Sequence, residues 1–213
     1  MRKREPVPDG LEMSIGEALF TQRATRRLKS DPSPDADLRL ILTAATKAPS
    51  GANAQPARFV VVRDPAKRRA FGELYFEAWW AKRRDHEGWS SKADIPEDDV
   101  NHRMAAILAD EIGEAPVIVL VWAQAPVAIG HSVFPSVQNL LLAARALGVG
   151  SVLTTLHDDV MPRVRALLGV PGKMAFHCCI PLGYPRGRFG PTSRLPYDEV
   201  CFADQWDAPL ELP

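Results

Sequence analysis

The segment that decides the fold reads Asn139-Leu140-Leu141-Leu142-Ala143-Ala144-Arg145-Ala146-Leu147-Gly148. Its density of leucine and alanine is typical of a buried helix, which we predict from Pro135 to Leu147. Gly148 and Gly150 end this helix, because glycine readily takes the backbone conformations that follow a helix C-terminus. The class of the fold then depends on the elements that flank it.

Apolar strands are predicted on both sides of this helix. Pro116–Trp122 has the composition of a central strand, and Arg58–Arg63 contains a similar run. Ser151–Thr155 is predicted as a short strand, and Ala175–Leu182 as the last core strand before an irregular tail. These segments supply a sheet.

Further helices are predicted between the strands. Ser14 can cap a first helix, with Glu17 three residues on, that runs to about Arg26. The others are expected at 35–48, 65–84, 100–112 and 158–169. The elements alternate only loosely, without a phosphate-binding glycine fingerprint or a repeat of fixed period. This pattern favours an α+β fold over a doubly wound nucleotide-binding fold.

Size and charge exclude several classes of protein. The 213 residues suit one domain, and 26 Lys and Arg balance 26 Asp and Glu, so no net charge would attract nucleic acid. The first residues lack the apolar stretch of a secretory signal, and no apolar run reaches the roughly 20 residues of a membrane span. We expect a cytoplasmic protein that binds neither nucleic acid nor a membrane.

Polar segments and cysteines carry two more expectations. Residues 1–13 are predicted to form a flexible N-terminal arm, and 85–99 a mobile lid or excursion. Cys178, Cys179 and Cys201 lack the spacing of metal ligands, and no His-Glu-x-x-His pattern occurs. We expect no metal site.

Three segments place polar groups where a loop meets a regular element. The first, Gln22–Arg27, holds three guanidinium groups that suit phosphate oxygens, although a solvated basic face would have the same composition. The second, Ala48–Pro56, offers the amides of Asn53 and Gln55, which fit the alternating acceptors and donor of a flavin pyrimidine edge. An ordinary helix-to-strand turn is the alternative for this loop.

The third segment pairs Gly150–Thr155 with the tail that begins at Gly183-Tyr184-Pro185. Three arginines lie among glycines and prolines in this tail, and they could form a second phosphate clamp: Arg186, Arg188 and Arg194. In their residue patterns and in their order along the chain, these segments, together with the Asn139–Gly148 helix, resemble the nitroreductase family. The resemblance extends from about Ile15 to Trp206.

The resemblance implies a fold, a cofactor and a partner. Members of this family are FMN enzymes of an α+β fold, with a central, mainly antiparallel sheet flanked by helices. They form domain-swapped homodimers that share active sites across the interface. The residues implied for FMN binding are Arg23, Ala24, Arg26, Pro49, Ser50, Gly51, Asn53, Leu153, Thr154, Thr155 and Arg194.

Among these residues, Arg23 would bind phosphate, and Arg26 would stabilise the negative charge of reduced flavin at its N1 and C2 carbonyl edge. Arg26 and Thr154 are the implied catalytic residues, and a threonine hydroxyl near N5 would permit one-electron steps. The chain departs from the family pattern at Gln22, Ala24 and Ala57, where arginine, serine and tryptophan are usual. Arg186 or Arg188 would then have to replace the phosphate contact of the arginine that Gln22 lacks.

The implied function is electron transfer in two half-reactions. NADH, NADPH or a deazaflavin would reduce FMN, leave, and be replaced by a small flat acceptor such as a nitroaromatic or a quinone. The alternatives are a reductive dehalogenase of the deiodinase type, which the threonines favour, and a flavin-binding protein without turnover. His157 could donate a proton but is expected to be structural. Phe76, Trp79 and Trp80 are expected in the core or at the dimer interface.

Overall fold

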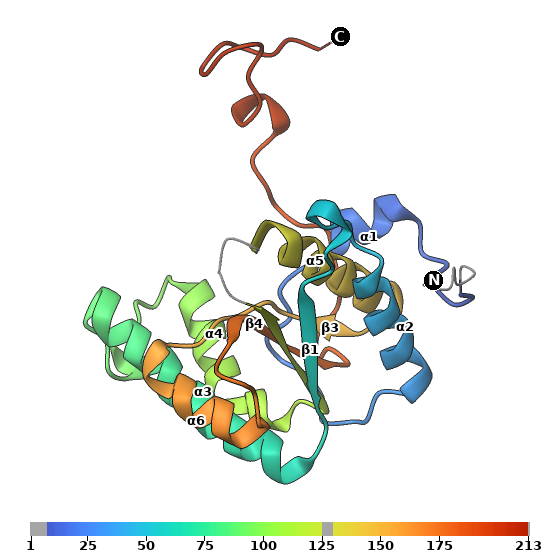
Figure 1. Cartoon of the computed structure of the whole chain (residues 1–213). Helices are drawn as coiled ribbons and strands as arrows, with labels where there is room; N and C mark the ends of the chain where they lie inside the picture. The colour runs from blue at the N-terminus through green and yellow to red at the C-terminus, as the bar shows by residue number, and fades with distance from the viewer. Residues whose placement is uncertain (1–7, 125–129, 213) are drawn as a thin grey trace.

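An antiparallel sheet with the strand order β1-β2-β4-β3 runs through the computed structural model, which describes residues 8–124 and 130–212 (Figure 1). The strands are β1 (Ala57–Val62), β2 (Val117–Gln124), β3 (Gly150–Ser151) and β4 (Met174–Gly183). Every pairing between them is antiparallel. The predicted α+β class and the mainly antiparallel sheet are confirmed.

Strand β2 is central, and helices cover both of its faces. Alternate side chains point to opposite faces of a strand, so Ile118, Leu120 and Trp122 join one hydrophobic cluster. Val119 and Val121 join the other. Burial on both faces explains why this strand is apolar throughout.

One helical layer contains α2 (Asp35–Thr46) and α5 (Gly130–Ala146), with the short α1 (Ile15–Thr21) beside α5 (Figure 1). The Nδ2 of Asn139 donates to the carbonyl of Ala44 over 3.2 Å, which satisfies one of the open carbonyls at the end of α2. The Leu- and Ala-rich segment Asn139–Gly148 therefore positions the loop that follows α2.

The other layer contains α3 (Pro65–Glu87), α4 (Val100–Glu111) and α6 (Met161–Leu168). Ile95, in the segment predicted as an excursion, is 3% exposed and belongs to the cluster beneath these helices. The first residues of 85–99 belong to α3, because this helix continues beyond Arg84, its predicted end, to Glu87. Part of 85–99 is therefore core structure, because an apolar side chain anchors the polar stretch. Of the predicted N-terminal arm, residues 1–7 lie outside the described residues.

The first helix is shorter than predicted. It ends at Thr21 and not near Arg26, and Gln22 already has an extended backbone. The reason is a pairing with the sheet edge: Ala24 bridges Ser151 in parallel, and the Thr25 N–H donates to the Ser151 carbonyl over 2.9 Å. The segment Gln22–Arg27, called the basic segment below, is thus held along β3.

The strand predicted at Ser151–Thr155 is interrupted. The pairs Gly150–Gly183 and Thr154–Cys179 belong to one register, which sets Val152 opposite Pro181. Pro181 has no N–H to donate, so the ladder breaks there. The strand formed is Gly150–Ser151, followed by an isolated bridge at Thr154.

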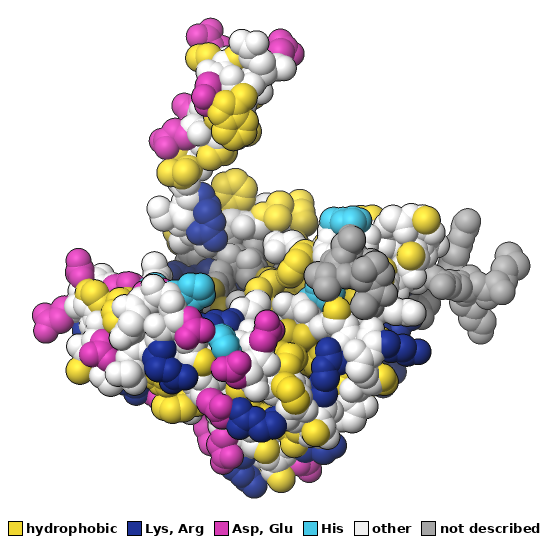
Figure 2. All heavy atoms as spheres, turned by 60° about the vertical axis from the view of Figure 1, so that its left-hand side comes forward, with side chains coloured by type: hydrophobic (Ala, Val, Ile, Leu, Met, Phe, Trp, Pro, Cys, Tyr) yellow, Lys and Arg dark blue, Asp and Glu magenta, His cyan; other side chains and the backbone are white. Residues whose placement is uncertain are grey.

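The C-terminal segment leaves the body of the molecule as an arm (Figure 1). Residues 195–212 contain five carboxylates and no Lys or Arg, and large apolar side chains on the arm are exposed, with Trp206 81% exposed. Figure 2 shows these acidic and hydrophobic side chains standing clear of the globular part. Among the described residues, no helix has the length and apolarity to cross a membrane.

Candidate functional site

The basic segment reaches the sheet through a close backbone contact at Gly150. A Cβ on this residue would lie 2.7 Å from Thr25 Cγ2 and 3.1 Å from the Gly183 carbonyl oxygen. Only a residue without a side chain allows the basic segment, β3 and the end of β4 to meet here. Arg23 is exposed and Arg26 half-buried at this edge.

The Gly183-Tyr184-Pro185 turn joins the same edge. The Lys29 N–H donates to the Tyr184 carbonyl over 2.8 Å, and the Arg186 N–H donates to the Arg27 carbonyl over 3.0 Å. The Arg186 side chain donates to the Leu28 carbonyl and contacts Glu111 at 3.1 Å. Arg186 is therefore committed to structure, and of the two predicted substitutes for Gln22 only the exposed Arg188 stays available.

Thr154 points toward α3. Its hydroxyl lies 2.8 Å from the hydroxyl of Tyr75, a side chain that is 1% exposed. Burial raises the pKa of Tyr75, while the bond to Thr154 and the positive charge of Arg26 oppose this rise. The structure therefore places the Thr154 hydroxyl on the buried hydroxyl of Tyr75, and the charge of Arg26 is near enough to lower the pKa of this phenol.

Thr155 meets a second residue of the same helix. The Lys82 ammonium donates to Thr155 Oγ1 over 2.6 Å, and burial lowers the pKa of Lys82. Sequence reasoning missed both Tyr75 and Lys82. Their spacing of seven residues places them on one face of α3, but this signal identifies a face of the helix and not what it touches.

The loop after α2 is held in a strained conformation. Ala52, Asn53 and Gln55 have φ values of 49°, 55° and 49°, in the left-handed region that non-glycine residues seldom adopt. Two contacts hold it: Ser50 Oγ accepts from the Gln55 N–H over 2.9 Å, and Gly51 N–H donates to Ser132 Oγ over 3.1 Å. A cavity of about 200 Å³ lies between the loop, α2 and α5. Pro49 and Asn53 face solvent.

The predicted site residues fall into two groups. Arg23, Ala24, Arg26 and 153–155 lie at the β3 edge, and the Thr154 hydroxyl faces the α3 layer. The loop with Pro49, Ser50, Gly51 and Asn53 precedes β1 at the opposite edge, beside α5. Three strand spacings amount to about 14 Å, and the chain does not bring the two groups together.

Arg194 returns toward the first group. The Thr192 N–H donates to the Phe20 carbonyl over 3.1 Å, which brings the tail beside the residues that precede the basic segment. The Arg194 guanidinium is exposed and bonds within the described residues only to the Ser193 carbonyl. It is placed where it could act with Arg23.

The residues at the β3 edge fit an anionic group. Within 8–124 and 130–212, neither Arg23 nor Arg26 forms a side-chain hydrogen bond or an ion pair. Guanidinium groups left without partners at an accessible sheet edge are suited to phosphate and to a developing negative charge. The Leu153 side chain, 38% exposed, adds apolar surface beside them.

Other candidates have structural roles. His157 lies 3.0 Å from Asp85 and 3.3 Å from Asp159, and its ring caps a short helix. Trp79 and Trp80 are buried, as predicted, whereas Phe76 is 44% exposed. Burial raises the pKa of Cys178 to about 12, which leaves its thiol unreactive. The described residues contain no group of His, Cys, Asp and Glu suited to a metal ion.

Comparison with known proteins places this geometry in a family. The model of the nitroreductase family matches residues 19–184. A protein of Thermus thermophilus named NADH dehydrogenase is 34% identical over 86% of this chain and 92% of its own. Iodotyrosine deiodinase of Thermotoga neapolitana is 28% identical over 84% of this chain and 91% of its own. The crystal structure of an iodotyrosine deiodinase bound to FMN and 3-iodo-L-tyrosine superposes with a TM-score of 0.71, at 27% identity, covering 90% of this chain and 99% of that one.

Proposed function

The chain belongs to the nitroreductase family, and we propose that it is an FMN-dependent oxidoreductase. It passes electrons from NADH or NADPH to a small flat acceptor such as a nitroaromatic or a quinone. The observation that carries the proposal is the pairing of the basic segment with β3, which sets Arg23 and Arg26, without side-chain partners among the described residues, at the same sheet edge as Thr154. The FMN bound to the deiodinase structure supports the choice of cofactor.

Each residue at this edge has a distinct task. Arg23, with Arg194 and Arg188, binds the phosphate by charge and by the geometry of the guanidinium fork. Arg26 would hold the pyrimidine edge, where its charge would stabilise the reduced cofactor. When bound, FMN supplies hydride acceptance from the donor and electron transfer to the acceptor.

The protein contributes orientation and electrostatics, and no nucleophile. Tyr75 holds the Thr154 hydroxyl over 2.8 Å, and a threonine hydroxyl can accept one hydrogen bond while it donates another. Thr154 can therefore offer its proton to the cofactor while Tyr75 keeps it in place. Catalysis rests on holding the acceptor against the flavin face.

A homodimer would complete the site. The Ser50–Asn53 loop lies at the other sheet edge, so it would serve the site of a partner chain. Exposed apolar residues support a partner: Ile15 and Phe20 of α1 are 70% and 74% exposed, and Trp206 of the arm is 81% exposed. The acidic arm of one protomer would lie on its partner, in keeping with the predicted domain swap.

Reductive dehalogenation is the second candidate. The Leu153-Thr154-Thr155 segment and the similarity to iodotyrosine deiodinases favour it. Both candidates share the cofactor and the site. They differ in the acceptor, a nitro or quinone group in one and a halogenated ring in the other.

The function is tested by following the flavin of the purified protein through both half-reactions. We expect a yellow protein that releases FMN on denaturation. NADH or NADPH should bleach its absorption under anaerobic conditions, and a nitroaromatic or a quinone should restore it. Recovery with halogenated phenols alone would replace the first candidate with the second. A protein that holds FMN which no donor reduces would be a flavin-binding protein, and one that binds no FMN would refute both candidates.

A further inference from the structure

Lys82 is a half-buried cation beside the proposed flavin site. Its Nζ donates to Thr155 Oγ1 over 2.6 Å, one residue after Thr154. In the part of the chain that the structure describes, no carboxylate lies within ion-pair distance of this ammonium. Burial lowers the pKa of Lys82, and the charge of Asp158 opposes this only weakly. The ammonium is therefore partly withdrawn from water and has no counter-ion among the described residues.

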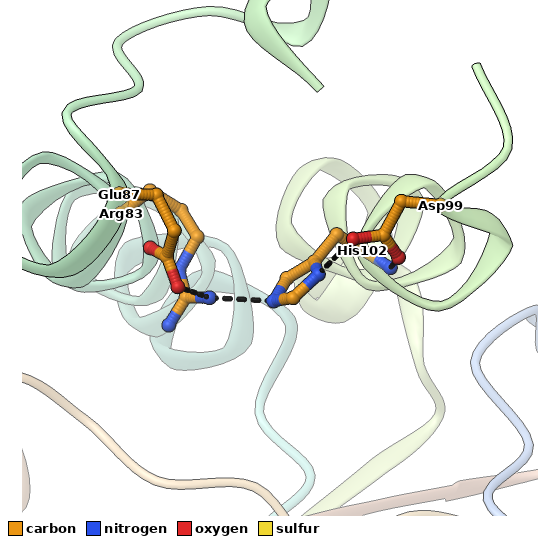
Figure 3. Close-up of polar contacts among 4 residues, drawn as sticks. All are labelled: Arg83, Glu87, Asp99 and His102. Atoms are coloured by element: carbon orange, nitrogen blue, oxygen red, sulfur yellow. Dashed lines mark hydrogen bonds and ion pairs between the residues drawn. The ribbon is translucent and has the colours of Figure 1, made fainter. Parts of the chain in front are cut away.

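The cation next to Lys82 in the chain is in a different situation. Figure 3 shows the Arg83 guanidinium bonded to both Glu87 and His102. Its Nη1 lies 3.0 Å from Glu87 Oε1 and 2.7 Å from His102 Nε2. His102 in turn contacts Asp99 at 2.6 Å. Because Arg83 can only donate, His102 Nε2 accepts and its Nδ1–H bonds to Asp99. The carboxylates of this network serve Arg83, and Lys82 has none.

An unpaired ammonium in a partly dry site favours an anionic ligand. Removing a charge from water is costly unless another charge compensates it. A ligand carboxylate would provide that compensation through a charge-assisted hydrogen bond. The Thr155 hydroxyl accepts from Lys82 and keeps its own proton, which it can donate to the same ligand.

The position of Lys82 separates it from the phosphate-binding residues. Ala24 pairs with Ser151 at the start of this segment, and Lys82 contacts Thr155 at its end. Four residues of extended chain span about 13 Å. Lys82 is therefore at the end remote from Arg23, where the acceptor and not the phosphate would lie.

We propose that Lys82, together with Thr155, selects flat aromatic acceptors that carry a carboxylate. This inference rests on the proposed function and deepens it by naming the chemical class of the acceptor. The ring would lie on the flavin, and the carboxylate would bond to the Lys82 ammonium and the Thr155 hydroxyl. Acceptors of the same shape without the negative charge would bind less well.

A matched pair of ligands tests the proposal. 4-Nitrobenzoate carries the carboxylate, and 4-nitrobenzamide has the same ring and nitro group without charge. For the FMN-loaded protein, we would measure the dissociation constant of each from the change in flavin absorption, and kcat/KM for each with one donor. We expect both measures to favour the benzoate by roughly 10-fold. In Lys82→Met this preference should disappear, because the benzoate binds less well while the benzamide binds as before. Lys82→Arg should keep much of the preference.

Arg84→Met is the matched control, because it removes an exposed cation of the same helix that lies outside the site. It should keep the preference, which separates local contact from general charge. Equal binding of the two ligands by the wild type, or a preference that survives in Lys82→Met, would overturn the proposal. So would loss of FMN from Lys82→Met. Preferential binding of the benzoate without electron transfer would refute the proposed function and leave the role of Lys82 standing.

Discussion

Replacing Arg26 with alanine is expected to slow reduction of the bound flavin by on the order of 100-fold, the size of effect found when one stabilising donor is removed from a developing anion. Arg26 is half-buried, its charge reaches the buried Tyr75, and no described residue pairs with it. Its charge is therefore available to the reduced cofactor. The midpoint potential of the flavin should fall as well. Anaerobic stopped-flow reduction and a redox titration measure the two effects.

Arg27→Ala is the control for this prediction. Arg27 follows Arg26 and is exposed, and the contact that the structure gives it uses its backbone carbonyl, which the substitution leaves in place. The variant loses the same charge from the same segment and should reduce at nearly the wild-type rate. Equal rates and potentials in the two variants would show that Arg26 has no special position at the cofactor.

Gly150→Ala is expected to destabilise the fold by about 1–3 kcal/mol and to weaken FMN binding. The new Cβ would lie 2.7 Å from Thr25 Cγ2 and 3.0 Å from Leu28 Cδ2. Relief of this overlap must move the basic segment away from β3, and with it Arg23 and Arg26. Denaturant unfolding of the apoprotein and a titration with FMN measure the two losses separately.

Gly187→Ala provides the comparison, because a Cβ at Gly187 meets nothing within 4 Å. This variant should unfold at the wild-type denaturant concentration and bind FMN as well as the wild type. If Gly150→Ala behaved in the same way, the contact between the basic segment and β3 would not be what positions the arginines.

The sequence predicted those parts of the fold in which composition and burial agree. The apolar run of β2 and the Leu- and Ala-rich α5 are examples, since each is enclosed by other elements along most of its length. The boundaries that failed depend on partners remote in the chain. The end of α1 is set by the pairing of Ala24 with Ser151, and the break after β3 by Pro181 on β4.

The site was predicted in part for the same reason. Arg26 and Thr154 stand in short motifs, so the resemblance could identify them. Tyr75 and Lys82 lie in an aromatic and basic stretch of α3 that reads as packing and solvated charge. Only the placement of α3 against Thr154 and Thr155 gives them a role. The separation of the loop at Asn53 from Arg26 likewise follows from strand order, which no local pattern contains.

The central claim is that one FMN site is assembled from two chains, with the Arg23 and Arg26 edge from one and the Ser50–Asn53 loop from the other. The most direct test combines two defective chains that carry different affinity tags, Arg23→Ala/Arg26→Ala and Ser50→Ala/Asn53→Ala. Each variant alone should bind FMN weakly. The purified mixed dimer should bind one FMN per two chains at wild-type affinity, because one of its sites has both halves intact. A mixed dimer that binds FMN no better than the parent variants would contradict the shared site.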